Sequence, residues 1–196
     1  MKPNPTTILI MTMVVSVLSF TPTLSQDMQL EIGDPAPEFK SITDNGEVWR
    51  SADHTGDKIL VVFFYPAAMT GGCTAQACSF RDNRTQLIDL GAEVVGISGD
   101  PVSNLELFRR ANNLNFPLLS DADGSIARAY GVPLRDGGSI TRVIDGEEYI
   151  LSRDVTTARW TFIIDTERKI AYIDTDVNAA GDSEAVITAI KEIITP

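Results

Sequence analysis

The sequence predicts one α/β domain in which strands alternate with helices around a largely parallel central sheet. Residues 59–65 form a continuous apolar run, which is the pattern of a strand covered on both faces. Segments with helical and strand patterns then alternate as far as residue 130. The 171 residues that follow position 25 are enough chain for one domain with its own core.

The individual elements follow from local patterns. An Asn-Gly pair at positions 45 and 46 favours a tight turn, so residues 38–49 predict an N-terminal β-hairpin. Residues 131–158 contain an Asp-Gly turn and predict a hairpin or an extended loop inserted before the next strand. We expect the remaining strands at residues 59–65, 92–98, 116–119, 160–164 and 169–174, and helices at residues 73–90, 101–113, 124–130 and 183–194.

Residues 1–25 have the features of a secretory signal peptide, with Lys2 ahead of an apolar core at residues 8–20. This core is shorter than the roughly 20 residues that span a bilayer, so a cleaved signal is favoured over a membrane anchor. We therefore expect residues 26–196 to form the folded domain of an exported protein, periplasmic or secreted. No stable membrane association is expected after cleavage.

Charge and composition disfavour several classes of function. The net charge of −11 would repel the phosphates of nucleic acids and of anionic membranes. His54 is the only histidine, and no further ligands stand near it at metal-binding spacing, so a solvated loop histidine is favoured over a metal ligand or general base. The sequence also lacks glycine-rich phosphate-binding motifs and serine-nucleophile motifs.

Both cysteines, Cys73 and Cys78, lie in the first half of the helix predicted after the strand at residues 59–65. A helix start favours a thiolate, because its backbone N–H groups are unpaired and its dipole is positive there. Gly71 and Gly72 leave space for a small substrate near the Cys73 sulfur. The Thr70 hydroxyl can donate a hydrogen bond to a bound oxygen or to the sulfur.

The spacing of the cysteines restricts how they can pair. Five residues of helix correspond to about 500° of rotation and a rise of roughly 7.5 Å, so the two sulfurs face apart. A disulfide needs Cα atoms within roughly 7 Å and converging side chains, which an intact helix does not provide. Either the cysteines never pair or the first helical turns unwind. A purely structural disulfide would gain little, because the closed loop is very short.

Two motifs resemble a known family. Residues 66–73, from Pro66 through Thr70 to Cys73, resemble the P-x-x-x-T-x-x-C signature of peroxiredoxins in the AhpC/TSA family. The continuation to Cys78 is similar to the bacterioferritin-comigratory-protein or PrxQ branch, whose resolving cysteine lies on the same helix. Residues 159–165 resemble the later R-x-T-F-x-I-D segment of that branch. One departure is Gly71, where the branch often has proline.

The resemblance implies a thioredoxin-like fold of the peroxiredoxin type, with a central mixed sheet, flanking helices and an N-terminal β-hairpin. It implies reduction of hydrogen peroxide and small organic hydroperoxides, with Cys73 attacking the peroxide and Cys78 resolving the resulting sulfenic acid through a disulfide. Thr70 and Arg159 would orient the peroxide and stabilise its charge, and Pro66 would shield the pocket.

The same resemblance implies a thioredoxin-like dithiol as the reductant, with no metal, haem or flavin, and a monomer or weak homodimer. Two other functions remain open. A thiol-disulfide exchange protein would normally carry a C-x-x-C motif, which counts against it here. A non-enzymatic, peroxide-responsive binding protein would use helix unwinding as a signal.

Overall fold

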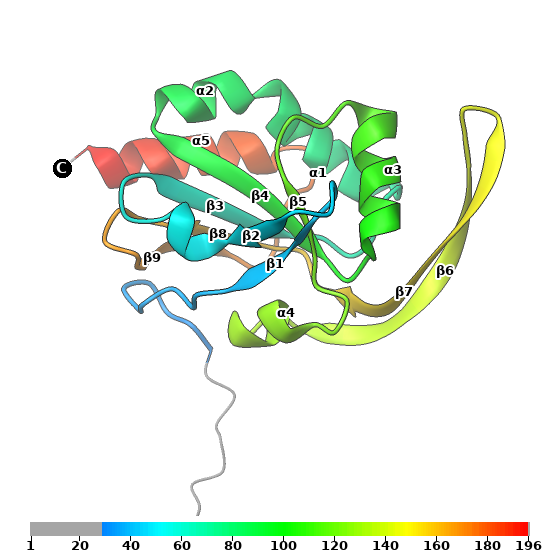
Figure 1. The fold of residues 1–196 in the computed structure, drawn as a ribbon. Helices are drawn as coiled ribbons and strands as arrows, with labels where there is room; N and C mark the ends of the chain where they lie inside the picture. The colour runs from blue at the N-terminus through cyan, green and yellow to red at the C-terminus, as the bar shows by residue number, and fades with distance from the viewer. Residues whose placement is uncertain (1–28, 196) are drawn as a thin grey trace, which may run out of the picture.

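The computed structural model describes residues 29–195 (Figure 1). Among these residues the main sheet contains β1 (Lys40–Thr43), β2 (Val48–Arg50), β3 (Ile59–Phe64), β4 (Ala92–Ser98), β5 (Leu118–Ser120), β8 (Trp160–Ile164) and β9 (Ile170–Asp174). They lie in the order β2-β1-β5-β4-β3-β8-β9. β3, β4 and β5 are parallel, and the other neighbours are antiparallel. The predicted mixed sheet is therefore confirmed, with three parallel strands at its centre.

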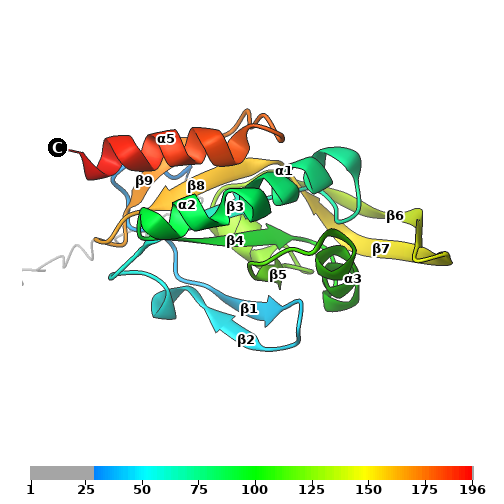
Figure 2. The ribbon, with the colours of Figure 1, turned by 90° about the horizontal axis from the view of Figure 1, so that it is seen from above.

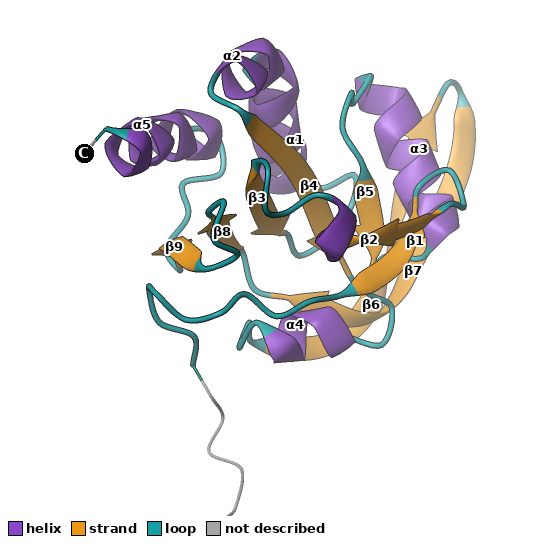
Figure 3. Ribbon diagram, turned by 60° about the vertical axis from the view of Figure 1, so that its left-hand side comes forward, coloured by secondary structure: helices purple, strands orange, loops and turns teal. Residues whose placement is uncertain are grey.

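Helices cover both faces of the sheet. They are α1 (Gly71–Asp82), α2 (Arg84–Asp89), α3 (Val102–Asn112), α4 (Ser125–Ala129) and α5 (Asp182–Ile194). α1, α2, α3 and α5 lie over one face (Figures 2 and 3), and α4 lies under the other (Figure 3). In the part of the chain that the structure describes, no helix combines the length and apolar character needed to cross a membrane. The proposed signal sequence at residues 1–25 lies outside the described residues.

β3 is an interior strand of the sheet, and all six of its side chains are apolar and buried. Successive side chains of a strand point to opposite faces, so this one strand contributes to two cores. Val61 and Phe63 pack into the cluster below α1, α3 and α5, whereas Leu60 and Val62 pack into the cluster above α4. The sheet is thus fixed between two apolar layers, and the chain leaves β3 at its carboxyl end toward α1.

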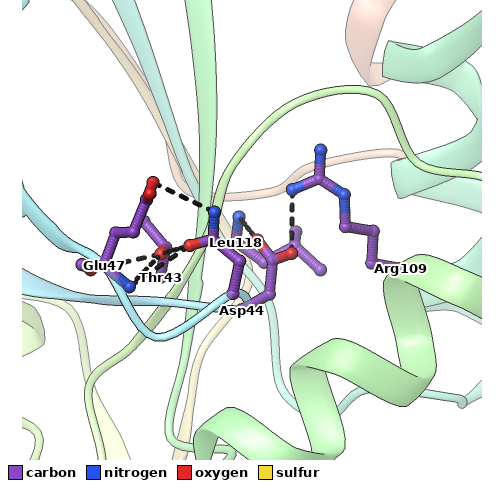
Figure 4. A network of polar contacts seen from close by, with 6 residues as sticks. Thr43, Asp44, Glu47, Arg109 and Leu118 are labelled. Atoms are coloured by element: carbon purple, nitrogen blue, oxygen red, sulfur yellow. Dashed lines mark hydrogen bonds and ion pairs between the residues drawn. The ribbon is translucent and has the colours of Figure 1, made fainter.

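The N-terminal hairpin of β1 and β2, which leads into a short 3₁₀ turn, η1 (Ser51–Asp53), is held by a buried carboxylate (Figure 4). Asp44 accepts a hydrogen bond from the Leu118 backbone N–H at 3.0 Å and forms an ion pair with Arg109 at 2.8 Å. Only 3% of Asp44 is exposed. One side chain therefore connects the hairpin with β5 and α3.

The helix predicted at residues 73–90 is divided in the structure. It begins at Gly71, and α1 ends at Asp82 before α2 starts at Arg84. Asn83 lies at the break and donates through its side-chain amide to the Ser183 hydroxyl of α5 at 2.8 Å. The prediction of one continuous helix was wrong. The apolar pattern continues past Asn83, whereas the structure ends α1 just before this residue, whose side chain contacts α5.

Residues 131–158 contain a long β-hairpin, formed by β6 (Leu134–Ile144) and β7 (Glu147–Thr157), that projects from the domain (Figure 1). The strands are joined at the predicted Asp-Gly turn, where both residues have positive φ. They approach very closely at Gly137, since a Cβ there would lie 1.9 Å from the Arg153 carbonyl oxygen. The hairpin passes α3, whose Asn104 amide donates to the Ser152 carbonyl at 3.0 Å.

Candidate active site

Cys73 lies in the first turn of α1, directly beyond the carboxyl end of β3. Thr70 is the residue before the helix and has an extended backbone, with φ of −102° and ψ of 151°. Cys73 is 1% exposed and belongs to the same buried cluster as Ala68 in the core below α1. Ala77, Phe80 and Leu87 share that buried cluster with the cysteine.

Arg159 reaches the cysteine from the start of β8. The pairing of Phe64 with Trp160 places the beginning of β8 beside the end of β3. From there the Arg159 Nη2 donates to the Cys73 Sγ at 3.3 Å. The structure thus brings together two predicted site residues that are 86 positions apart in the chain. A cation at this distance stabilises negative charge on the sulfur.

The two glycines before Cys73 have different surroundings. A Cβ on Gly72 would lie 3.3 Å from the Arg159 Nη2, so this glycine leaves room for the guanidinium. A Cβ on Gly71 would meet nothing within 4 Å. Both glycines are exposed to solvent. Space for the arginine therefore depends on position 72, and the departure from the family pattern at Gly71 faces open solvent.

Two further residues extend this site into the interior. The Arg159 Nη1 donates to the Gln76 Oε1, and the Gln76 Nε2 donates to the Asp182 Oδ2 at 2.6 Å. The Thr161 hydroxyl donates to the same Asp182 oxygen at 2.8 Å. Burial raises the pKa of Asp182 to about 6, against the effect of these hydrogen bonds.

Gln76 and Asp182 were not among the residues predicted for the site. Gln76 follows Cys73 by three positions, so both lie on the same face of the helix, and this spacing was an available signal. Asp182 is 106 positions from Gln76 and belongs to a different helix. No local pattern marks such a contact.

The loop of residues 66–70, called the active-site loop below, is fixed from two sides. The buried Asp100 accepts the Ala68 backbone N–H at 2.7 Å. The Arg142 Nε, on β6, donates to the Met69 carbonyl at 2.8 Å. Met69 has a φ of 61°, a region that non-glycine residues seldom occupy. Contacts from the hairpin and from beyond β4 therefore hold a strained turn next to Cys73.

The other predicted site residues, Pro66 and Thr70 in this loop and Cys78 on α1, make no hydrogen bond to the Cys73 sulfur. The Thr70 hydroxyl donates to the Ala67 carbonyl at 2.9 Å. Pro66 is partly exposed between β3 and the rest of the loop. Cys78 is partly exposed farther along α1, and both cysteines are free thiols. This agrees with the expectation that an intact helix keeps the two sulfurs apart.

His54 takes part in a separate contact. Its ring stacks on Trp49 with the centroids 4.4 Å apart, and its Nδ1 lies 2.7 Å from the Glu93 Oε2. The histidine is thus a partly buried packing residue rather than a solvated one. Within residues 29–195, no three or more side chains of His, Cys, Asp or Glu are grouped so that they could bind a metal ion.

Comparisons with known proteins agree on one family. The AhpC/TSA family profile matches residues 32–173. Peroxiredoxin Bcp of Escherichia coli strain K12 is 36% identical over 163 residues, which cover 83% of this chain and 97% of that protein. The crystal structure of peroxidoxin BcpB from Mycobacterium tuberculosis is similar with a TM-score of 0.70 and 32% identity, covering 85% of this chain and all of that one. The bacterioferritin comigratory protein of Xanthomonas campestris, in structures that address its alkyl peroxide reduction activity, gives a TM-score of 0.65 at 26% identity, over 79% of this chain and 91% of that one.

Proposed function

Because this chain belongs to the AhpC/TSA family and is a peroxiredoxin, we propose that it reduces hydrogen peroxide and small organic hydroperoxides through Cys73. The observation that carries this assignment is the contact of 3.3 Å between the Arg159 Nη2 and the Cys73 Sγ. An organic substrate is supported by the alkyl peroxide reduction activity attributed to the relative from Xanthomonas campestris. A small peroxide would approach along the exposed glycines at the start of α1.

In the first step the Cys73 thiolate attacks the terminal peroxide oxygen. An S–O bond forms with an electron pair from sulfur, the O–O bond breaks, and the leaving oxygen takes a proton and departs as water or an alcohol. Arg159 and the backbone N–H groups at the start of α1 would stabilise the charge that moves onto that oxygen. The Thr70 hydroxyl would orient the O–O bond after exchanging its Ala67 partner for the substrate. Pro66 would limit the access of water.

In the second step Cys78 would attack the sulfenic sulfur of Cys73, so that an S–S bond forms and hydroxide leaves as water. This step requires the first turns of α1 to unwind, because both cysteines lie on one helix. An external dithiol of thioredoxin-like type would then reduce the disulfide by thiol exchange. No metal, haem or flavin takes part in these steps.

We also propose that the protein is exported and acts as a monomer or weak homodimer. The support for export is the signal-like pattern of residues 1–25. The reductant would then be a thioredoxin-like protein of the same compartment. The prediction is checked by expressing the full chain and determining the N-terminus of the protein recovered outside the cytoplasm. Recovery of the uncleaved chain from the cytoplasm alone would contradict it.

Thiol mapping tests the chemistry. The reduced protein is treated with one equivalent of hydrogen peroxide, alkylated and analysed by mass spectrometry, with Cys78→Ser and Cys73→Ser as matched variants. The expected products are a Cys73–Cys78 bond in the wild type, oxidation confined to Cys73 in Cys78→Ser, and no reaction in Cys73→Ser. An unreacted Cys73 in both the wild type and Cys78→Ser would overturn the assignment.

Turnover separates an enzyme from a sensor. With an excess of dithiol, an enzyme consumes many peroxide molecules per chain, whereas a peroxide-responsive binding protein consumes one. We expect repeated turnover that depends on both cysteines.

A further inference from the structure

We propose that Asp182 is a positioning residue for Arg159, acting through Gln76 to hold the guanidinium against the Cys73 sulfur. This inference rests on the proposed function of Cys73. It concerns a buried carboxylate on α5 that makes no hydrogen bond to the reacting sulfur in the structure.

The directions of the hydrogen bonds carry the argument. The side-chain amide of Gln76 has a donor end and an acceptor end, and the two ends are otherwise nearly alike in shape. An ionised carboxylate only accepts, so Asp182 requires the Nε2 end of the amide to face it. The Oε1 end is thereby turned toward the Arg159 Nη1, which only donates. If the amide were reversed, its donors would face the donors of the guanidinium, and the contact with Arg159 would be lost.

The surroundings of these groups make the arrangement specific. Gln76 and Thr161 are fully buried and Asp182 is 2% exposed, so water cannot replace a lost partner. Thr161 of β8 also donates to the Asp182 Oδ2, so this one oxygen accepts hydrogen bonds from both α1 and β8. Arg159 directly precedes β8, so both ends of the hydrogen-bond chain connect to the same strand.

A general structural role does not account for Asp182. Its Oδ1 is buried and has no hydrogen-bond partner among the described residues. No ion pair within residues 29–195 involves its carboxylate. A buried carboxylate without a charged partner destabilises a fold, so joining two helices is a poor reason for one. The next residue, Ser183, already joins α5 to Ser79 of α1 and to Asn83, which follows α1.

Ser183 therefore provides the matched control. Asp182→Ala and Ser183→Ala each remove two polar contacts of α5, one of them to α1, but only Asp182 lies on the path to Arg159. The reaction of the fully reduced protein with hydrogen peroxide is followed by stopped flow in a single turnover, before any disulfide exchange. In parallel, the Arg159 Nε–H signal is observed in ¹H–¹⁵N correlation spectra, and Arg159→Lys serves for its assignment.

Asp182→Ala is expected to slow the peroxide reaction about tenfold, because a small displacement of a group that orients the substrate is costly. Ser183→Ala should slow it by less than about twofold. Asp182→Asn keeps an acceptor oxygen and should recover most of the rate. Adding Asp182→Ala to Gln76→Ala should cause little further loss, because both act through one chain of contacts.

The spectra decide the inference even if no peroxide is consumed. A shift or broadening of the Arg159 signal in Asp182→Ala, absent in Ser183→Ala, supports the positioning role. An unchanged Arg159 signal would overturn it, as would equal rate losses in the two variants. A wild type that does not react with peroxide would instead refute the proposed function.

Discussion

Replacing Asp182 with asparagine should change how the stability of the protein depends on pH. Burial raises the pKa of this carboxyl from 3.8 to about 6 in the folded protein, while hydrogen bonds from Gln76 and Thr161 lower it only in part. One pKa unit corresponds to about 1.4 kcal/mol, so ionising Asp182 destabilises the folded state by about 3 kcal/mol. Asparagine keeps an acceptor for both hydrogen bonds and carries no charge.

The sign follows from where the proton is held. Between about pH 4 and pH 6 the folded protein keeps a proton on Asp182, whereas the unfolded chain has released it. The contribution to stability is fully present below the unfolded pKa and is lost as the pH rises through the folded pKa. The free energy of unfolding of the wild type should therefore fall, relative to that of Asp182→Asn, as the pH increases through this range.

The assay is urea unfolding of both proteins at about pH 4 and about pH 7.5, with the free energy of unfolding extrapolated to water. Relative to Asp182→Asn, the wild type should lose about 2.4 kcal/mol of unfolding free energy between these two pH values, because at pH 4 the unfolded carboxyl is already partly ionised. Ser183→Ala removes a neighbouring side chain that does not titrate and should give a constant difference. A difference for Asp182→Asn that is constant, or that rises with pH, would refute the reasoning.

Three other contacts give further predictions. Arg142→Ala removes the hydrogen bond to the Met69 carbonyl, so amide hydrogen exchange in the active-site loop should become about tenfold faster. An unchanged exchange rate would mean that the hairpin does not restrain this loop. Gly137→Ala places a Cβ against the opposite strand and should speed limited proteolysis of the hairpin, unlike Gly138→Ala, whose Cβ meets nothing within 4 Å. Asp44→Ala should lower the free energy of unfolding by about 2 kcal/mol in urea titrations, because it leaves a buried N–H group unpaired.

The sequence allowed the regular elements to be predicted where a local pattern determines them. The strands at residues 92–98 and 160–164 have the expected bounds, because buried strands are marked by short apolar runs between turns. The division of the first long helix at Asn83 could not be predicted, since it coincides with a hydrogen bond to α5. For residues 131–158 the sequence predicted a turn but did not distinguish a hairpin from an extended loop, because the exposed strands lack a strong apolar pattern.

The candidate site was also predicted only in part. The likeness to peroxiredoxin motifs indicated Cys73 and Arg159, and the structure places them in contact. Physical reasoning about the helix start predicted a favourable position for a thiolate, but not the buried residues that orient the arginine. Asp182 follows a loop at the far end of the chain, and only the folded arrangement brings it to Gln76.

Gln76 lies between Cys73 and Cys78 on the same helix, and this placement has a consequence for the oxidised protein. Any ring closed by those two sulfurs includes Gln76, so forming it must pull the amide away from its carboxylate partner on α5. Sulfur chemistry at one end of the domain would thus detach a support of the C-terminal helix. How firmly that helix is attached to the rest of the domain would therefore depend on the redox state of the two cysteines.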